Sequence, residues 1–236
     1  MKKNRYLIKL SGEIIKGNQE SGVSLEAADN LSKKIFSILK KNIKLGFVIG
    51  GGNIFRGASK IIKGYNRILG DQIGMMATVV NALVLSERMQ ANGIPTLLQS
   101  GIKIDGIVDL FNKEKIEEVF KKKGVVIFCG GIGNPYFSTD TTSALRALQI
   151  EAEWIFKATK VDGIYDKDPK KYSDAKFYDS ITYNEILEKK LRIMDLSSII
   201  LMKENNLKLR VFNIFDKHDT LEKACSGGKI GTVVIR

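Results

Sequence analysis

The string Leu45-Gly46-Phe47-Val48-Ile49-Gly50-Gly51-Gly52-Asn53-Ile54-Phe55-Arg56-Gly57 joins a short apolar run to three consecutive glycines. The apolar run predicts a buried strand, and the glycines leave the backbone open to a ligand. We expect a helix to start directly after the glycines, where its N–H groups and positive dipole end attract phosphate. Arg56, about one turn into that helix, can grip phosphate with two hydrogen bonds. A plain turn needs one glycine rather than three, so the string favours a phosphate-binding loop.

The same pattern of an apolar strand followed by glycines recurs along the chain. Val125–Cys129 runs into Gly130-Gly131, and the first strand runs into Ser11-Gly12. Further apolar runs predict strands at Arg5–Leu10, Thr96–Gln99, Trp154–Ala158, Arg210–Ile214 and Thr232–Ile235. Strands that alternate with helical patterns indicate an α/β fold, a three-layer αβα sandwich around a mostly parallel central sheet. Ligands of such sheets bind beyond the carboxyl ends of the strands, where the glycines stand.

Capping residues and apolar spacing predict the helices between these strands. Ser24 caps the first helix, Gly93 and Pro95 end the longest, and Thr182 with Glu185 forms a capping box. One predicted helix follows Ser24 and another follows Thr182. The others are expected at about Asn66 to Asn92, Lys113–Lys123, Thr139–Ile150, Asp195–Asn205 and Leu221–Ala224.

Length and composition exclude several classes of protein. The chain has 236 residues, of which 44% are hydrophobic and 27% charged, so it is not wholly disordered and forms one large domain or two tightly packed lobes. Cys129 and Cys225 fit a reducing cytosol better than a disulfide scaffold. The single histidine, His218, excludes a multi-histidine metal site and is expected on the surface. The N-terminal residues show no signal peptide and Asn81 interrupts the longest apolar run, so we expect a cytoplasmic protein without a membrane span.

The net charge of +12 leaves two interpretations open. One is a partner rich in phosphate, either nucleic acid or a nucleotide, and the other is a lysine-rich composition without functional meaning. Only eight of the 38 cationic residues are arginine, and recognition of base edges favours arginine. Nucleic-acid binding is therefore the weaker interpretation.

Loops at the ends of four strands carry residues suited to a nucleotide. Lys9 can place a positive charge on a phosphoryl group, and Asp140 can orient lysines or simply interact with a helix dipole. Asp168 can accept from ribose hydroxyls, although Asp168-Pro169 also suits a plain turn. The other residues that can touch a base, sugar or phosphate are Ser11, Gly12, Asn134, Thr139, Thr159, Lys160 and Tyr165. The sequence has no P-loop signature, no dinucleotide fingerprint after the first strand and no nucleophile elbow.

Taken together, four strings resemble the bacterial uridylate kinases, a branch of the amino acid kinase fold family. They are Lys9-Leu10-Ser11-Gly12-Glu13, the glycine string from Gly50 to Gly57, Gly133-Asn134-Pro135-Tyr136-Phe137-Ser138-Thr139-Asp140 and Lys157-Ala158-Thr159-Lys160-Val161-Asp162-Gly163. The match runs in order from Lys9 to Met194-Asp195-Leu196. The resemblance implies transfer of the γ-phosphoryl group of ATP to UMP, with Mg²⁺, in pyrimidine nucleotide biosynthesis.

The resemblance also implies roles for individual residues. Catalytic roles fall to Lys9, Arg56, Asp140 and Asp195. ATP is expected to contact Lys9, Leu10, Ser11, Gly12, Gly52, Arg56, Thr159, Tyr165 and Asp168. UMP is expected to contact Gly51, Asp71, Ile132, Gly133, Asn134, Pro135, Tyr136, Phe137, Ser138 and Thr139. Asp71 is expected on the ribose, and the carboxylate that contacts Mg²⁺ stays open.

For the whole chain, the resemblance implies one domain, with an acceptor-side lobe at about 1–150 and an ATP-side lobe at about 151–236. It also implies a cytosolic homohexamer with UTP as a feedback inhibitor. Ser86 and Gln90 stand where many members carry the Arg and His of a GTP site, so we expect weak or absent activation by GTP. Ile132 lacks the hydroxyl of the threonine common at its position, so one contact to UMP is expected from the backbone only. The alternatives are another small-molecule kinase of this fold or a nucleic-acid-binding protein; neither nucleic acid nor a membrane is required.

Overall fold

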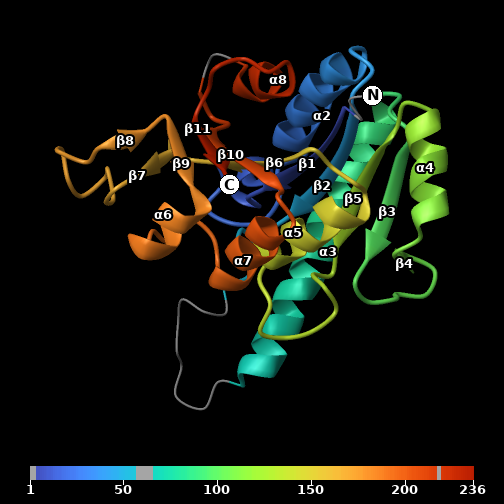
Figure 1. The fold of residues 1–236 in the computed structure, drawn as a ribbon. Coiled ribbons are helices and arrows are strands. Elements are labelled where there is room, and N and C mark those ends of the chain that lie inside the picture. The colour runs from blue at the N-terminus through green and yellow to red at the C-terminus, as the bar shows by residue number, and fades with distance from the viewer. Residues whose placement is uncertain (1–3, 57–65, 217–218) are drawn as a thin grey trace.

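The computed structural model describes residues 4–56, 66–216 and 219–236, and both Gly57 and His218 lie outside these ranges. Within them, nine strands form one sheet in the order β4-β3-β5-β2-β1-β6-β10-β11-β9 (Figure 1). The strands are β1 (Arg5–Leu10), β2 (Lys44–Ile49), β3 (Thr96–Ser100), β4 (Asp109–Leu110), β5 (Val125–Cys129), β6 (Trp154–Thr159), β9 (Ser180–Thr182), β10 (Lys208–Asn213) and β11 (Thr232–Ile235).

The sheet is mostly parallel, as predicted. Only the pair β10–β11 is antiparallel among the described strand pairs of this sheet. The first strand, β1, lies between β2 and β6, and the chain builds one side of the sheet before it crosses to the other. The carboxyl ends of β1, β2, β5 and β6 therefore meet at one edge, at the point where the direction of strand addition reverses, which is where ligands of such sheets bind.

Alternating strand residues face two hydrophobic cores, one on each side of the sheet. In β1, Ile8 belongs to the core under α2, α3 and α8, whereas Leu7 belongs to the core under α4, α5, α6 and α7. Figure 1 shows α2 and α8 on one side of the sheet and α5 and α7 on the other, so the predicted three-layer sandwich is confirmed. The helices are α1 (Glu13–Lys16), α2 (Leu25–Leu39), α3 (Arg67–Ala91), α4 (Lys113–Lys121), α5 (Thr139–Gln149), α6 (Tyr183–Glu188), α7 (Leu196–Glu204) and α8 (Thr220–Cys225).

The predicted helix caps form. The Ser24 hydroxyl accepts from the N–H of Ala27 at 3.2 Å, and Thr182 and Glu185 form the reciprocal capping box. These side chains satisfy N–H groups that the first helical turn leaves without a partner.

The prediction of a helix directly after the glycines is wrong. The N–H groups of Ile54 and Phe55 both donate to Gly51 O at 3.0 Å, which makes one turn that no helix continues in the described residues up to Arg56. A glycine-rich turn can present its N–H groups to an anion without a helix behind it. The next described helix, α3, begins at Arg67.

Helix α3 is long and apolar enough to cross a membrane by length and composition. In the fold it packs against α2 and the sheet, and buries Val79, Ala82, Leu85 and Met89 there. A core helix of a folded domain passes the same composition test, so this one helix is weak evidence for a membrane span.

Candidate active site

Two lysines share one aspartate at the carboxyl edge of the sheet. Lys9 of β1 and Lys157 of β6 are register partners on adjacent parallel strands. Asp140, in the first turn of α5, lies 3.1 Å from Lys9 Nζ through one oxygen and 3.1 Å from Lys157 Nζ through the other. The three side chains are only 14–16% exposed. Two ammonium groups are therefore fixed at one point by a single carboxylate.

Lys157, for which the sequence analysis predicted no role, has a further partner in the site. Lys157 Nζ also donates to the carbonyl of Ile193. Burial lowers the pKa of Lys157 below its ordinary value, while the charges of Asp140 and Asp195 oppose that shift. Asp140 therefore favours the charged form of Lys157 as well as holding its position.

Asp195 ties α7 to α5 through hydroxyl groups. Its carboxylate accepts from the hydroxyls of Ser138 and Thr141, with 2.9 Å for the latter, and from the N–H of Ser198 at 2.8 Å. Burial alone raises the pKa of Asp195, but these donors outweigh it, and the pKa lies below its ordinary value of 3.8. Asp195 thus fixes the start of α5, which carries Asp140.

A second charged group surrounds Glu13, directly after the first strand loop. Glu13 forms ion pairs with Arg56 and with Lys160 at 2.9 Å, and a longer one with Lys16 at 3.5 Å. The hydrogen bond from Lys160 lowers the pKa of Glu13 more than burial raises it. Arg56 Nε also donates to Gly52 O at 2.8 Å, so its guanidinium lies against the glycine turn.

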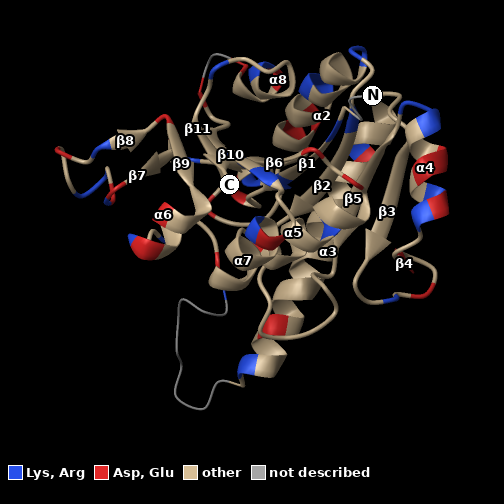
Figure 2. Ribbon diagram, in the orientation of Figure 1, with Lys and Arg blue, Asp and Glu red and all other residues tan. Residues whose placement is uncertain are grey.

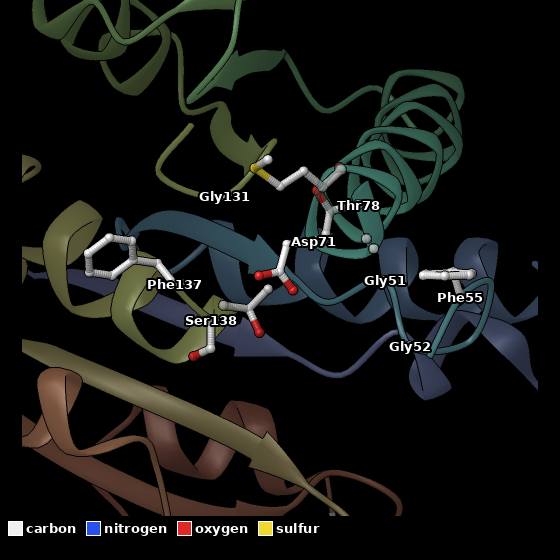
Figure 3. A pocket seen from close by; sticks show the side chains of 12 residues that line it. Gly51, Gly52, Phe55, Asp71, Thr78, Gly131, Phe137 and Ser138 are labelled. Carbon is white, nitrogen blue, oxygen red and sulfur yellow. The ribbon is translucent and has the colours of Figure 1, made fainter. Parts of the chain in front are cut away.

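A cavity of about 170 Å³ opens between the glycine turn, α3 and the start of α5. Figure 3 shows Asp71 pointing from α3 toward the side formed by Ser138, with Gly51 and Gly52 along the opposite side. The predicted UMP contacts that line this cavity are Gly51, Asp71, Phe137, Ser138 and Thr139, and the predicted ATP contact Gly52 lines it too.

The remaining predicted UMP contacts lie outside the lining of this cavity. They are Ile132, Gly133, Asn134, Pro135 and Tyr136. Their loop is nevertheless joined to the cavity, because the N–H of Tyr136 donates to Asp71 at 2.8 Å. Gly133, with φ +93°, packs so tightly on Gly101 that a Cβ would lie 2.4 Å from Gly101 O, which requires glycine.

A larger cavity of about 760 Å³ borders the lysine pair. Three predicted ATP contacts, Thr159, Tyr165 and Asp168, line it together with Lys157. Tyr165 lies on a short hairpin of β7 (Ile164–Tyr165) and β8 (Phe177–Tyr178). Its ring packs edge-on against that of Phe177, with 5.3 Å between the ring centroids. The rim carries further cations, including Lys171, Lys190 and Arg192.

The other predicted ATP contacts belong to the loop after β1. Ser11 and Gly12 lead into α1, and Lys16 N donates to Gly12 O at 3.1 Å. The Leu10 side chain is fully buried in the core, and its carbonyl accepts from Gly50 N at 3.0 Å. Leu10 therefore connects the loop after β1 to the glycine loop through its backbone.

Sequence reasoning missed the site roles of Lys157 and Glu13, and it expected Lys160 at a nucleotide rather than paired with Glu13. A signal for Lys157 was present, because a charged residue inside an otherwise apolar strand has to be paired. Its register opposite Lys9 needs the strand order, which the sequence does not reveal. Glu13 and Lys160 meet across 147 residues, so only the fold brings them together.

Known proteins are similar to this chain in fold and in sequence over almost its whole length. The amino acid kinase family model matches residues 4–213. The chain is 47% identical over 231 residues to the uridylate kinase of Fervidobacterium nodosum, which covers 98% of this chain and 97% of that protein. The crystal structure of UMP kinase from Ureaplasma parvum superposes with a TM-score of 0.91 at 37% identity and 100% coverage of both chains. The crystal structure of UMP kinase from Bacillus anthracis superposes with a TM-score of 0.92 at 29% identity, and the match covers 100% of this chain and 97% of that chain. The chain therefore belongs to the amino acid kinase family, and within it to the uridylate kinases.

Proposed function

We propose that this protein transfers the γ-phosphoryl group of ATP to UMP and so forms ADP and UDP. One observation carries the proposal: the larger cavity is lined by Lys157 and predicted ATP contacts, and the smaller one by predicted UMP contacts up to Thr139, the residue before Asp140. The names of the relatives, uridylate kinase and UMP kinase, support the choice of acceptor. Adenosine occupies the larger cavity, with its phosphates directed toward Lys9.

The chemistry of the step suits these residues. Phosphoryl transfer needs two anionic reactants held in line, and it needs the charge on the transferred group neutralised. Lys9 and Lys157 supply two positive charges at the centre, and Arg56 supplies a third beside the glycine turn. The acceptor is a phosphate oxygen that is already ionised near neutral pH, so no general base is required.

Mg²⁺ is the expected companion of ATP. Among the described residues, no group of three or more His, Cys, Asp or Glu is arranged to hold a metal alone. This donor set fits an ion that arrives on phosphate oxygens and keeps several waters, the usual state of Mg²⁺ at such sites. Asp140 and Asp195 are the carboxylates available to it, and bound Mg²⁺ would neutralise phosphate charge.

The two proposed nucleotide sites belong to different halves of the chain. The smaller cavity is lined by residues 51–139 and the larger by residues 157–211, which supports one domain with an acceptor-side lobe at about 1–150 and an ATP-side lobe at about 151–236. The two cysteines, Cys129 and Cys225, are free and buried, which suits a cytoplasmic location. UTP, which shares its base with the acceptor, is the proposed feedback inhibitor.

We also propose self-association, as a homohexamer, through α3. Figure 2 shows this helix without charge along its middle, and no charged residue lies between Asp71 and Glu87. Five large apolar residues at alternating spacings of four and three are at least 37% exposed: Leu69, Ile73, Met76, Val80 and Leu83. A stripe of this spacing is the seam by which two helices pack together. Sedimentation of the purified protein at micromolar concentration tests it: a monomer would refute self-association, and any other oligomer would refute the hexamer.

The test of the proposed activity is ADP release from ATP and Mg²⁺ with one acceptor at a time. UMP, CMP, dTMP, GMP, glutamate, aspartate and carbamate form the panel, and the Lys9→Ala variant is the control against a contaminating kinase. Turnover with UMP supports the proposal. Turnover with an amino acid or carbamate instead would retain the fold and reject the uridine assignment. Failure with every acceptor would redirect attention to the positive charge, tested by a nucleic-acid mobility shift near physiological salt.

A further inference from the structure

Two buried asparagines face each other beneath the glycine loops. Asn53 follows the glycines and is 4% exposed, and Asn81 lies in the middle of α3 and is fully buried. Asn53 Nδ2 donates to Asn81 Oδ1 at 3.0 Å, and Asn81 Nδ2 donates back to Asn53 Oδ1 at 2.7 Å. The pair is the polar interruption of an otherwise apolar helix.

All four amide N–H groups of the pair have an acceptor. Besides their mutual bonds, Asn53 Nδ2 donates to Gly22 O at 2.8 Å and Asn81 Nδ2 donates to Gly50 O at 2.7 Å. Turning either amide over would bring donor against donor inside the pair and an oxygen against a carbonyl oxygen outside it. The network therefore permits one arrangement of these two side chains.

The pair touches three separate loops. It holds the Gly50 carbonyl at the start of the glycine turn, and the loop before α2 at Gly22, whose N–H donates to Asn53 O at 2.9 Å. It also abuts the loop after β1, because a Cβ on Gly12 would lie 1.9 Å from Asn53 Oδ1. Gly12 and Gly50–Gly52 are the two backbone segments that face the expected phosphates.

Stability alone does not call for this network. Replacing both partners of a buried hydrogen bond by apolar groups of the same shape is often neutral or stabilising, whereas removing one partner is costly. The network's specific consequence is geometric, since it sets how far the loop after β1 stands from the glycine turn. A misplacement of about 1 Å can lower the rate of a reaction on the order of 10²-fold.

We propose that Asn53 and Asn81 are positioning residues for phosphoryl transfer, which fix the two phosphate loops relative to each other and to the loop at Gly22. Neither side chain needs to touch a nucleotide for this role, and neither lines either cavity. The inference rests on the proposed function, because its consequence is a rate of phosphoryl transfer.

The test compares Asn53→Ala, Asn81→Ala, the double variant and Asn81→Asp. The last keeps the shape but faces an acceptor toward Gly50 O. The control is Ser32→Ala. It removes the hydrogen bond from the buried Ser32 side chain to Arg88 O of α3, at 3.2 Å, which involves none of the three loops. Kinetics are measured well below each variant's unfolding temperature, and amide hydrogen exchange is followed without nucleotide.

We expect kcat to fall on the order of 10²-fold in each single variant, with KM for UMP changed by less than about threefold. The double variant loses little more than the worse single variant, because the two residues act as a unit. Exchange accelerates at residues 10–13, 20–23 and 50–53, and Ser32→Ala changes neither kcat nor this exchange.

The inference would be overturned if folded variants kept the wild-type kcat and lost only unfolding free energy. It would also be overturned if the kcat loss of the double variant equalled the product of the two single losses. If a single variant fails to fold, the double variant takes its place, because it removes both partners of the mutual hydrogen bonds and leaves neither amide unpaired inside the pair. If the wild-type protein did not phosphorylate UMP, the proposed function would fail, and the exchange experiment would still report whether the pair fixes the loops.

Discussion

Removing the Lys9 ammonium should cost the reaction far more than it costs the binding of UMP. At an effective dielectric constant of about 20, an ammonium group about 4 Å from a phosphoryl oxygen contributes about 4 kcal/mol. Part of that attraction already exists in the bound state, and removing one donor from a preorganised anion site typically lowers kcat on the order of 10²–10³-fold. We expect Lys9→Ala to fall in that range, with KM for UMP changed by less than about threefold.

The structure makes this substitution interpretable. Asp140 keeps its second ion pair, with Lys157 at 3.1 Å, so the variant leaves no unpaired buried carboxylate. Lys44→Ala is the matched control, because Lys44 opens β2 at the opposite end of the sheet, in register with Arg5. Steady-state ADP release at varied UMP measures both constants. A Lys9→Ala enzyme with wild-type kcat, or one whose loss lies wholly in KM for UMP, would refute the reasoning.

Three further predictions follow from the same geometry. Asp71→Asn should raise KM for UMP about tenfold or more with a smaller change in kcat, because a hydrogen bond to a charged group is worth about 1.5–3 kcal/mol; an unchanged KM would remove Asp71 from the acceptor site. GTP should raise activity little at subsaturating ATP, since Ser86 and Gln90 bond each other at 3.3 Å and carry no charge, and a several-fold activation would contradict this. The stability contributed by Asp195 should be complete above its ordinary pKa of 3.8 and disappear as the pH falls through its lower folded value. Urea unfolding should therefore show that Asp195→Asn loses less stability than the wild type as the pH falls. Identical slopes of unfolding free energy against pH for the two proteins would count against the Asp195 hydrogen bonds.

The elements that could be predicted from sequence are those with a local cause. The strand β5 is apolar at every position and is bounded by glycines, and α6 begins at a capping box whose two halves stand three residues apart. The hairpin β7–β8 was missed because each strand has two residues, too few for an alternating pattern to appear. The predicted helix after Gly52 failed because a glycine-rich phosphate loop needs no helix to present its N–H groups.

The site divides in the same way. Lys9 and Asp140 stand in the strings that resemble the uridylate kinases, whereas Asp71 lies outside them and its role was expected from the resemblance alone. Lys157 depends on the neighbouring position of β1 and β6, which are far apart in the chain. Asn81 looked like an interruption of an apolar run until the fold placed it against Asn53. The contacts of Lys157 and Asn81 could not be predicted, because they depend on segments that only the fold brings together.

The proposed reaction requires the two nucleotides to bind on opposite sides of the Lys9–Asp140–Lys157 centre. A crystal structure with UMP and a non-hydrolysable ATP analogue would show where each one binds. We expect uridine beside Asp71, adenosine beside Tyr165 and the facing phosphates between them at Lys9. Nucleotides in exchanged cavities, or phosphates that meet away from Lys9, would contradict this expectation.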